Sequence, residues 1–307
     1  MREIAGPEGP AIRRFGGAMQ TAVFAAVGMA LVLAGGGSSA ADEAAPALDL
    51  AIAIDTSGTM ERLLDAARTD VWDFAARLAA EDPERTLRVA VLTYGNFHAG
   101  EDAGWVRIEA PLTTDLDLVV SRLFAARITG DTEYVARVVR TAVEGLEWDP
   151  AGSSRRILVV LGNERATQDP QVSLEESVRI ARDRGVEVRP VYCGAPRSSD
   201  VASWTRLATL AGTSLAILEP APGGQATTPF DGEIAALGNA FAATYAKKRD
   251  AGVEAAETER TRLKVRIQDL AARRRQFVES RGGWRKPAPE LSTVLLDRVR
   301  EGDAPRD

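Results

Sequence analysis

Continuous apolar runs of strand length recur along the chain, separated by amphipathic segments. The runs cover residues 48–55, 87–94, 155–163, 186–194 and 214–218, and a shorter one covers residues 105–113. Runs of this kind, bounded by turn residues, are typical of parallel strands that are buried on both faces. The run at residues 105–113 predicts a strand that pairs antiparallel at an edge of the sheet.

Apolar residues between these runs recur every three or four positions, which predicts helices with one buried face. The stripe that follows the first run consists of Leu64, Ala67, Val71, Phe74 and Leu78. Further helices are expected over residues 116–126, 135–146 and 200–211, and from a capping box at residues 173–176 to Gly185. Strands that alternate with helices predict an α/β fold, in which helices flank a doubly wound, mostly parallel sheet.

The pattern changes after Leu218, which ends the predicted domain of residues 48–218. Residues 219–233 read EPAPGGQATTPFDGE and have the composition of a linker. Residues 234–307 are predicted to form a helical C-terminal tail, because two apolar stripes follow the linker. The first stripe is Ile234, Leu237, Phe241 and Tyr245, and the second, spaced as in a short coiled coil, is Leu263, Ile267, Leu270 and Phe277.

Residues 1–41 have the pattern of a secretory signal peptide. Arg13 and Arg14 precede an apolar run, and small residues follow it up to Ala40 and Ala41. The alternative is an uncleaved membrane anchor, because the run is close to the shortest length that spans a bilayer. We therefore expect export to the periplasm or cell surface of a bacterium, with possible membrane association through the N-terminal segment.

The charge and the residue composition exclude several kinds of binding site. A formal net charge of −6 excludes a globally basic nucleic-acid binder. The single cysteine, Cys193, cannot form an internal disulfide, and the single histidine, His98, argues against a histidine-based zinc site. A metal ion bound by this chain would therefore be a hard cation with oxygen ligands.

Such ligands gather directly after the first predicted strand, which ends in the sequence DTSGTM. Asp55, Ser57 and Thr59 alternate along this turn, so their oxygen atoms can converge on one point. Carboxylate and hydroxyl oxygens suit Mg²⁺ or Ca²⁺. Functional sites of doubly wound sheets lie at the carboxyl ends of the strands, which adds the loops RITGDTEY and GNERAT to the candidate site. The alternative is that the hydroxyl groups only cap the following helix.

These segments resemble a von Willebrand factor type A domain with a metal-ion-dependent adhesion site. In that family the site reads D-x-S-x-S, followed by a distant threonine and by an aspartate after the fourth strand. Asp55 and Ser57 match the first motif, Thr59 replaces its last serine, and Thr132 matches the distant threonine. Asn163 stands where the family has the aspartate. The resemblance covers residues 48–218, and residues 257–280 also resemble a helical tail of some exported bacterial members.

The resemblance implies a Rossmann-like fold and a bound Mg²⁺, Ca²⁺ or Mn²⁺ ion. It also implies a protein partner that presents a carboxylate to complete the coordination of the ion. Asn163 offers a neutral oxygen, so one formal charge of compensation is lost and the affinity for the ion should fall. Asp131 and Glu164 are next to the expected ligands and could compensate.

An enzymatic alternative is weaker. The sequence DTSGT is similar to the D-K-T-G-T motif of phosphate-transferring ATPases, in which the aspartate is phosphorylated, but those enzymes also need a G-D-G-x-x-D loop. This chain contains no G-D-G, and its one histidine and one cysteine offer no credible nucleophile–base pair. We therefore predict a binding module and not an enzyme.

The tail is basic. Residues 247–286 contain thirteen Lys and Arg and six Asp and Glu. These charges could form a solvated face of the tail helix. Alternatively, the basic helix could dock on the acidic domain, on anionic lipid or on a partner. We expect a semi-independent arm used for association, which truncation after Ala246 would remove without unfolding the domain. The alternative to a metal-dependent binding module is thus a scaffold protein with a degenerate metal site that acts through its helical tail.

Overall fold

A computed structural model describes residues 47–60, 64, 74, 85–130, 132–150, 154–218, 229–246, 253–281 and 291–300. The predicted signal peptide lies outside these residues, as does most of the predicted linker. The described residues all belong to one of the two units of the chain, Ala44–Asp307. None of the helices described within it is long and apolar enough to cross a membrane.

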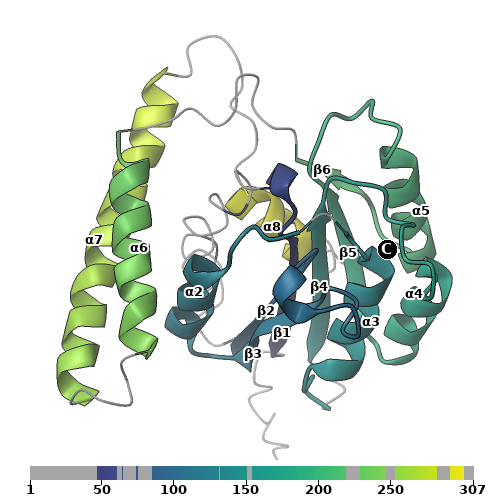
Figure 1. Ribbon diagram of the computed structural model, residues 1–307, viewed down its shortest axis with the longest axis horizontal. Helices are drawn as coiled ribbons and strands as arrows, with labels where there is room; N and C mark the ends of the chain where they lie inside the picture. The colour runs from purple at the N-terminus through teal and green to yellow at the C-terminus, as the bar shows by residue number, and fades with distance from the viewer. Residues whose placement is uncertain are drawn as a thin grey trace, which may run out of the picture. The chain divides into compact units, whose positions relative to one another are not determined.

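The strands are β1 (Leu48–Asp55), β2 (Leu87–Tyr94), β3 (Arg107–Thr113), β4 (Arg155–Gly162), β5 (Glu187–Tyr192) and β6 (Ala216–Ile217). They form a single sheet in the order β3-β2-β1-β4-β5-β6 (Figure 1). Strand β3 is antiparallel to β2 at one edge, and every other pairing is parallel. The predicted strands and the antiparallel edge strand are confirmed.

The helical elements are η1 (Gly58–Met60), η2 (Phe97–Ala99), α2 (Leu116–Ala125), α3 (Val135–Gly145), α4 (Leu174–Asp183), α5 (Val201–Ala211), α6 (Asp231–Ala246), α7 (Val253–Arg281) and α8 (Leu291–Arg300). Of the helix predicted after the first strand, the structure describes only Leu64 and Phe74, which are both helical and buried. Ser173 caps α4 by accepting a hydrogen bond from the Glu176 amide, as the capping box predicts.

A hydrophobic core lies on each face of the sheet, because successive side chains of a strand point to opposite faces. Leu50, Ile52 and Ile54 of β1 belong to the core that includes α2, α6, α7 and α8. Ala51 and Ala53 belong to the other core, which is covered by α3, α4 and α5. All eight residues of β1 are buried, as expected for the centre of a doubly wound sheet.

The second helix of the tail packs on α6, which in turn packs on α2 of the domain, and this contradicts the expected semi-independent arm. Leu263, Ile267 and Leu270 of α7 are buried in the same core as β1. Lys264 Nζ also forms an ion pair of 2.7 Å with Asp117 Oδ1 of α2. The amphipathic stripe on α7 is therefore part of the core and not a free association surface.

The last helix completes this core. Leu295, Leu296 and Val299 of α8 have no exposed surface. Arg155 of β4 donates from Nη1 to the Val299 carbonyl over 2.9 Å, and Arg298 donates from Nη1 to Ser214 Oγ over 3.0 Å. Removal of α8 would expose these apolar side chains and their partners on the sheet. We therefore expect truncation after Ala246 to destabilise the domain, in place of the folded domain expected from the sequence.

Candidate metal centre

The site begins with a buried carboxylate at the end of the central strand. Asp55 has no exposed surface. Its Oδ1 atom accepts a hydrogen bond of 2.7 Å from the Ser57 amide, whereas its Oδ2 atom is buried with no hydrogen-bond partner. An unsatisfied buried carboxylate oxygen is costly, and a bound cation would satisfy it.

The electrostatics of Asp55 also favour a counter-ion. Burial raises the pKa of the Asp55 carboxyl from 3.8 to about 8. The carboxylates of Glu133 and Glu164 raise this pKa further, whereas the hydrogen bonds from Ser57 lower it. The ionised form of Asp55 therefore lies in a buried and negatively charged environment, and a positive ion would stabilise it.

The turn after β1 is held against the loop that contains Thr132. Ser57 and Gly130 form an isolated parallel bridge, and the Gly58 amide donates to the Gly130 carbonyl over 3.3 Å. The Thr129 amide donates to the Thr56 carbonyl over 3.2 Å. Two chain segments more than seventy residues apart are thereby joined by backbone hydrogen bonds next to Asp55.

Glycines allow the closest contacts of this assembly. A Cβ atom on Gly130 would lie 1.9 Å from the Gly95 carbonyl oxygen, so only glycine fits there. Gly95 itself has a φ of +69°, and a Cβ atom on it would lie 3.3 Å from Asp55 Oδ1. The loop after β2 therefore forms a second wall of the site, in direct contact with Asp55.

The loop after β4 forms the third wall. Trp204 of α5 donates from Nε1 to the Glu164 carbonyl over 2.6 Å, and Tyr94 donates from its hydroxyl group to the Leu161 carbonyl over 2.8 Å. A side chain on Gly162 would collide with the Tyr94 hydroxyl, which a Cβ atom would approach to 2.2 Å. The segment that carries Asn163 is therefore fixed from both sides.

Two further acids lie between these walls. Glu133 is buried, and Gln168 Nε2 donates to Glu133 Oε2 and to Glu164 Oε2, each over 3.2 Å. Burial and the neighbouring Glu164 raise the pKa of Glu133 to about 7, against the opposing hydrogen bonds from Gln168 and Ser57. Glu133 Oε1 is buried without a hydrogen-bond partner. The site thus holds more negative charge than Asp55 alone supplies.

The structure describes some of the predicted metal ligands and not others. The Ser57 amide donates to Asp55 Oδ1, so these two residues lie together in the turn after β1. Thr132 and Asn163 are partly buried on the two loops that flank them. Thr59 lies in η1, but its side chain is outside the described part of the structure, and Asp131 lies outside it altogether.

Glu133 was missed by sequence analysis, although it directly follows Thr132 and this position was the available signal. Glu164 was expected as a compensating acid, and its charge does act on Asp55. Within the described ranges, no three His, Cys, Asp or Glu side chains form a group that could hold a metal ion on their own. A cation here would need hydroxyl and amide oxygens as well, the kinds of ligand that Ser57, Thr132 and Asn163 carry and that hard divalent cations accept.

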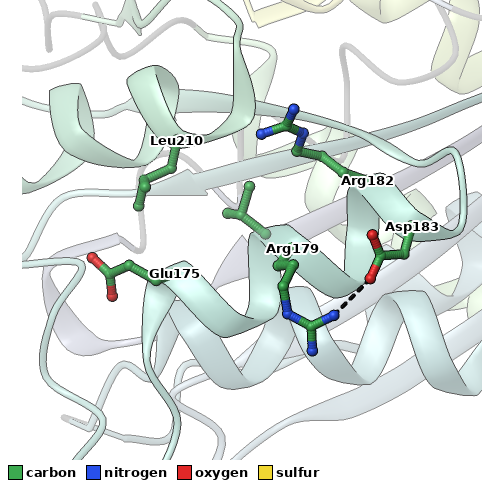
Figure 2. Close-up of a pocket in the computed structure, with 6 residues that line it drawn as sticks. Glu175, Arg179, Arg182, Asp183 and Leu210 are labelled. Atoms are coloured by element: carbon green, nitrogen blue, oxygen red, sulfur yellow. Dashed lines mark hydrogen bonds and ion pairs between the residues drawn. The ribbon is translucent and has the colours of Figure 1, made fainter.

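A surface hollow lies elsewhere, between α4 and α5 (Figure 2). It is lined by Glu175, Val178, Arg179, Arg182, Asp183 and Leu210. Arg179 and Asp183 form an ion pair of 2.7 Å on the exposed face of α4, and Glu175 pairs with Arg206. Exposed pairs of this kind are a solvated helix surface, so the hollow offers no competing site.

Several solved structures are similar to part of this chain. The SpRpn10 VWA domain is 17% identical, with a TM-score of 0.42, over 57% of this chain and 90% of that one. Proximal thread matrix protein 1 from the mussel byssus, solved with a zinc-occupied MIDAS motif, is 13% identical, with a TM-score of 0.43, over 57% of this chain and 42% of that one.

The open conformation of the pilus adhesin SpaC from Lactobacillus rhamnosus GG is 14% identical, with a TM-score of 0.42. The match covers 74% of this chain and 30% of the adhesin, so this chain spans less than half the length of the adhesin and of the mussel protein. No curated protein sequence matches the chain. The profile of the von Willebrand factor type A domain matches residues 49–215, more than half of the 307 residues. The chain therefore belongs to the von Willebrand factor type A domain family.

Proposed function

We propose that the protein is an exported binding module that holds a divalent cation at Asp55 and uses it to engage an acidic group of a protein partner. The observation that carries the proposal is the buried Oδ2 atom of Asp55, which has no hydrogen-bond partner where three loops meet. Family membership supports a binding role.

Asp55, Ser57, Thr59, Thr132 and Asn163 are the proposed ligands of Mg²⁺, with Ca²⁺ and Mn²⁺ as alternatives. The bound ion would supply an open coordination position for a carboxylate of the partner. Asp55 would supply the charged ligand, and the hydroxyl and amide side chains would supply neutral oxygens. Glu133 and Glu164 would compensate from nearby for the charge that Asn163 lacks, since both already act on Asp55.

The alternative role, a scaffold that acts through a free basic tail, has less support. Lys264 pairs with Asp117 of α2, Arg266 with Glu233 of α6 over 2.5 Å, and Arg274 with Asp231 of α6 over 2.9 Å. These cations of α7 are engaged within the protein, and the apolar stripe of the same helix is buried. Of the partners considered for the basic tail, these contacts favour the rest of this chain, through α6 and α2.

Calorimetric titration of the mature protein with Mg²⁺, Mn²⁺ and Ca²⁺ tests the proposal. We expect binding of at least one ion at a single site, loss of that binding in Asp55→Ala, and tighter binding in Asn163→Asp. Asp183→Ala removes an exposed acid of α4 and is the matched control, which should bind like the wild type. Binding that survives in Asp55→Ala would show that the cation lies elsewhere.

An Asn163→Asp variant that binds the cation no more tightly than the wild type would not argue against a cation at Asp55. It would show that Glu133 or Glu164 already supplies the missing charge. The proposal of a cation at Asp55 would stand, and the ligand role of Asn163 would not.

A further inference from the structure

A second carboxylate oxygen near Asp55 is buried without a hydrogen-bond partner. Glu133 is 1% exposed, and its Oε1 atom meets no hydrogen-bond donor in the part of the chain that the structure describes. Its other oxygen, Oε2, accepts a hydrogen bond of 3.2 Å from Gln168 Nε2. Burial of an unpaired acceptor costs free energy, so Glu133 Oε1, like Asp55 Oδ2, would be stabilised by a bound cation.

The side chains of Glu133 and Asp55 are neighbours. A Cβ atom on Gly95 would lie 3.3 Å from Asp55 Oδ1 and 3.6 Å from Glu133 Cγ, so both side chains pack against one point of the loop after β2. The Ser57 side chain is a hydrogen-bonding neighbour of both carboxylates. Of the two nearby glutamates, Glu133 has a stronger electrostatic effect on Asp55 than Glu164 has. The two unpaired oxygens therefore belong to adjacent side chains that share Ser57.

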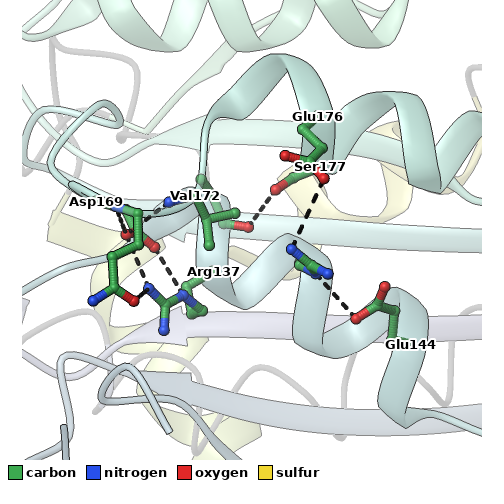
Figure 3. A network of polar contacts seen from close by, with 9 residues as sticks. Arg137, Glu144, Asp169, Val172, Glu176 and Ser177 are labelled. Carbon is green, nitrogen blue, oxygen red and sulfur yellow. Dashed lines mark hydrogen bonds and ion pairs between the residues drawn. The ribbon is translucent and has the colours of Figure 1, made fainter. Parts of the chain in front are cut away.

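A polar network fixes the segments that carry Glu133 and Gln168 (Figure 3). Glu133 lies two residues before α3, and Arg137 is in the first turn of this helix. Arg137 donates to both carboxylate oxygens of Asp169, over 2.9 and 3.0 Å, and Asp169 directly follows Gln168. The Asp169 side chain is 1% exposed, so this pair is shielded from water. Glu133 is therefore held in place before any ion binds, which reduces the entropy cost of binding one.

We propose that Glu133 is a direct ligand of the divalent cation, through Oε1, and supplies the carboxylate that Asn163 lacks. Asp55 and Glu133 together compensate both charges of the ion, whereas Asp55 alone compensates one. Carboxylate and hydroxyl oxygens are the ligands that hard divalent cations take. Glu164 shares Gln168 with Glu133 but acts as a supporting charge. This inference rests on the proposed function and deepens it, because it turns Glu133 from a nearby charge into a ligand.

Titration calorimetry of the mature protein with Mg²⁺, Mn²⁺ and Ca²⁺ tests this role with two substitutions at one position. Glu133→Gln keeps the length of the side chain and removes the charge, whereas Glu133→Asp keeps the charge and withdraws it by one methylene group. We expect each to weaken cation binding by at least about tenfold, since loss of even an indirect partner of a metal site costs about 10–100-fold.

Glu164→Gln is the matched control, because Gln168 contacts both glutamates in the same way. It should weaken cation binding by less than about fivefold, the effect of a partly hydrated charge. Thermal unfolding in a chelator checks that each variant folds. Glu133→Gln removes a buried charge next to Asp55, so without a cation this variant should be no less stable than the wild type.

The outcomes separate the inference from the proposed function. Wild-type affinity in Glu133→Asp would show that only the charge of Glu133 matters, and equal losses in Glu133→Gln and Glu164→Gln would show the same. Either result would overturn the inference and leave a cation at Asp55 in place. Absence of cation binding by the wild type, or binding that is unchanged in Asp55→Ala, would overturn both the inference and the proposed function.

Discussion

At the scale of single residues, the candidate site is defined by one carboxylate with an unusual environment. Asp55 ends a fully buried strand, and burial together with Glu133 and Glu164 raises its pKa to about 8. Without a counter-ion, the folded protein favours the protonated form of this side chain near neutral pH. The stability of the protein should therefore depend on pH and on divalent cations.

We expect the cation-free protein to lose stability as the pH rises from about 4 to about 8. The pKa of Asp55 is 3.8 without the fold and about 8 within it, so the folded state keeps a proton that the unfolded state releases. The stabilisation that comes from the proton on folded Asp55 is fully present below pH 3.8 and is lost as the pH rises through about 8. Asp55→Asn does not titrate and should show a flatter profile.

Thermal unfolding in a chelator at several pH values measures this difference. Between pH 5 and pH 8, the free energy of unfolding of the wild type should fall relative to that of Asp55→Asn by an amount on the order of a few kcal/mol. A constant difference between the two proteins over that range would mean that Asp55 is already ionised in the folded state. Addition of a divalent cation at pH 8 should restore the stability of the wild type alone.

The residues of the site were predicted unevenly, and the reason is physical. Asp55 and Ser57 follow from a short motif, because their spacing fixes their geometry within one turn. Glu133 was missed because a glutamate in a polar loop is usually exposed. Its burial arises only when the turn after β1 and the loops after β2 and β4 converge, and that convergence is not encoded near position 133.

At the scale of elements, the strands were predictable because continuous apolar runs leave few alternatives. The packing of the tail was not. An apolar stripe shows that a helix buries one face, but not which surface it covers. Leu263, Ile267 and Leu270 fit a free coiled-coil arm as well as a packed helix, and the structure places them in the core of the domain.

The contact between α6 and α2 offers a direct test of this packing. A Cβ atom on Gly238 of α6 would lie 1.9 Å from the ring of Phe124 in α2, whereas Gly232 of the same helix has no atom within 4 Å. We expect Gly238→Ala to destabilise the protein by about 1–3 kcal/mol, since the overpacked ring must move. Gly232→Ala is the matched control and should leave stability nearly unchanged or slightly raised.

Urea denaturation of the two variants measures these effects. If Gly238→Ala were as stable as Gly232→Ala, the close contact between α6 and α2 would not exist in solution. The packing of α6 on α2, through which α7 is attached to the domain, would then have to be abandoned.

At the scale of the whole molecule, the basic tail and the acidic remainder of the chain are joined by ion pairs such as Lys264–Asp117. Exposed pairs contribute little individually, so burial of the apolar stripe and not charge holds the tail in place. The unequal charge of the two parts therefore does not by itself indicate a nucleic acid or a membrane as partner.

Export is a separate prediction for the whole chain. The pattern of residues 1–41, which lie outside the described structure, predicts cleavage near Ala41 or Asp42. Amino-terminal sequencing of the protein made in a Gram-negative host should begin at one of these residues. Recovery of an intact Met1 or Met19 terminus in the membrane fraction would instead establish the anchor.

The central claim, a divalent cation held at Asp55, is tested most directly by a crystal structure of the mature protein soaked in Mn²⁺. Anomalous scattering locates this ion without assumptions about its ligands. We predict a peak about 2.0–2.6 Å from Asp55 Oδ2, the range of hard cations and their oxygen ligands, and near Ser57, with no such peak in Asp55→Ala. A well-ordered wild-type site that shows no peak, with Asp55 Oδ2 bonded only to water or protein, would contradict the account.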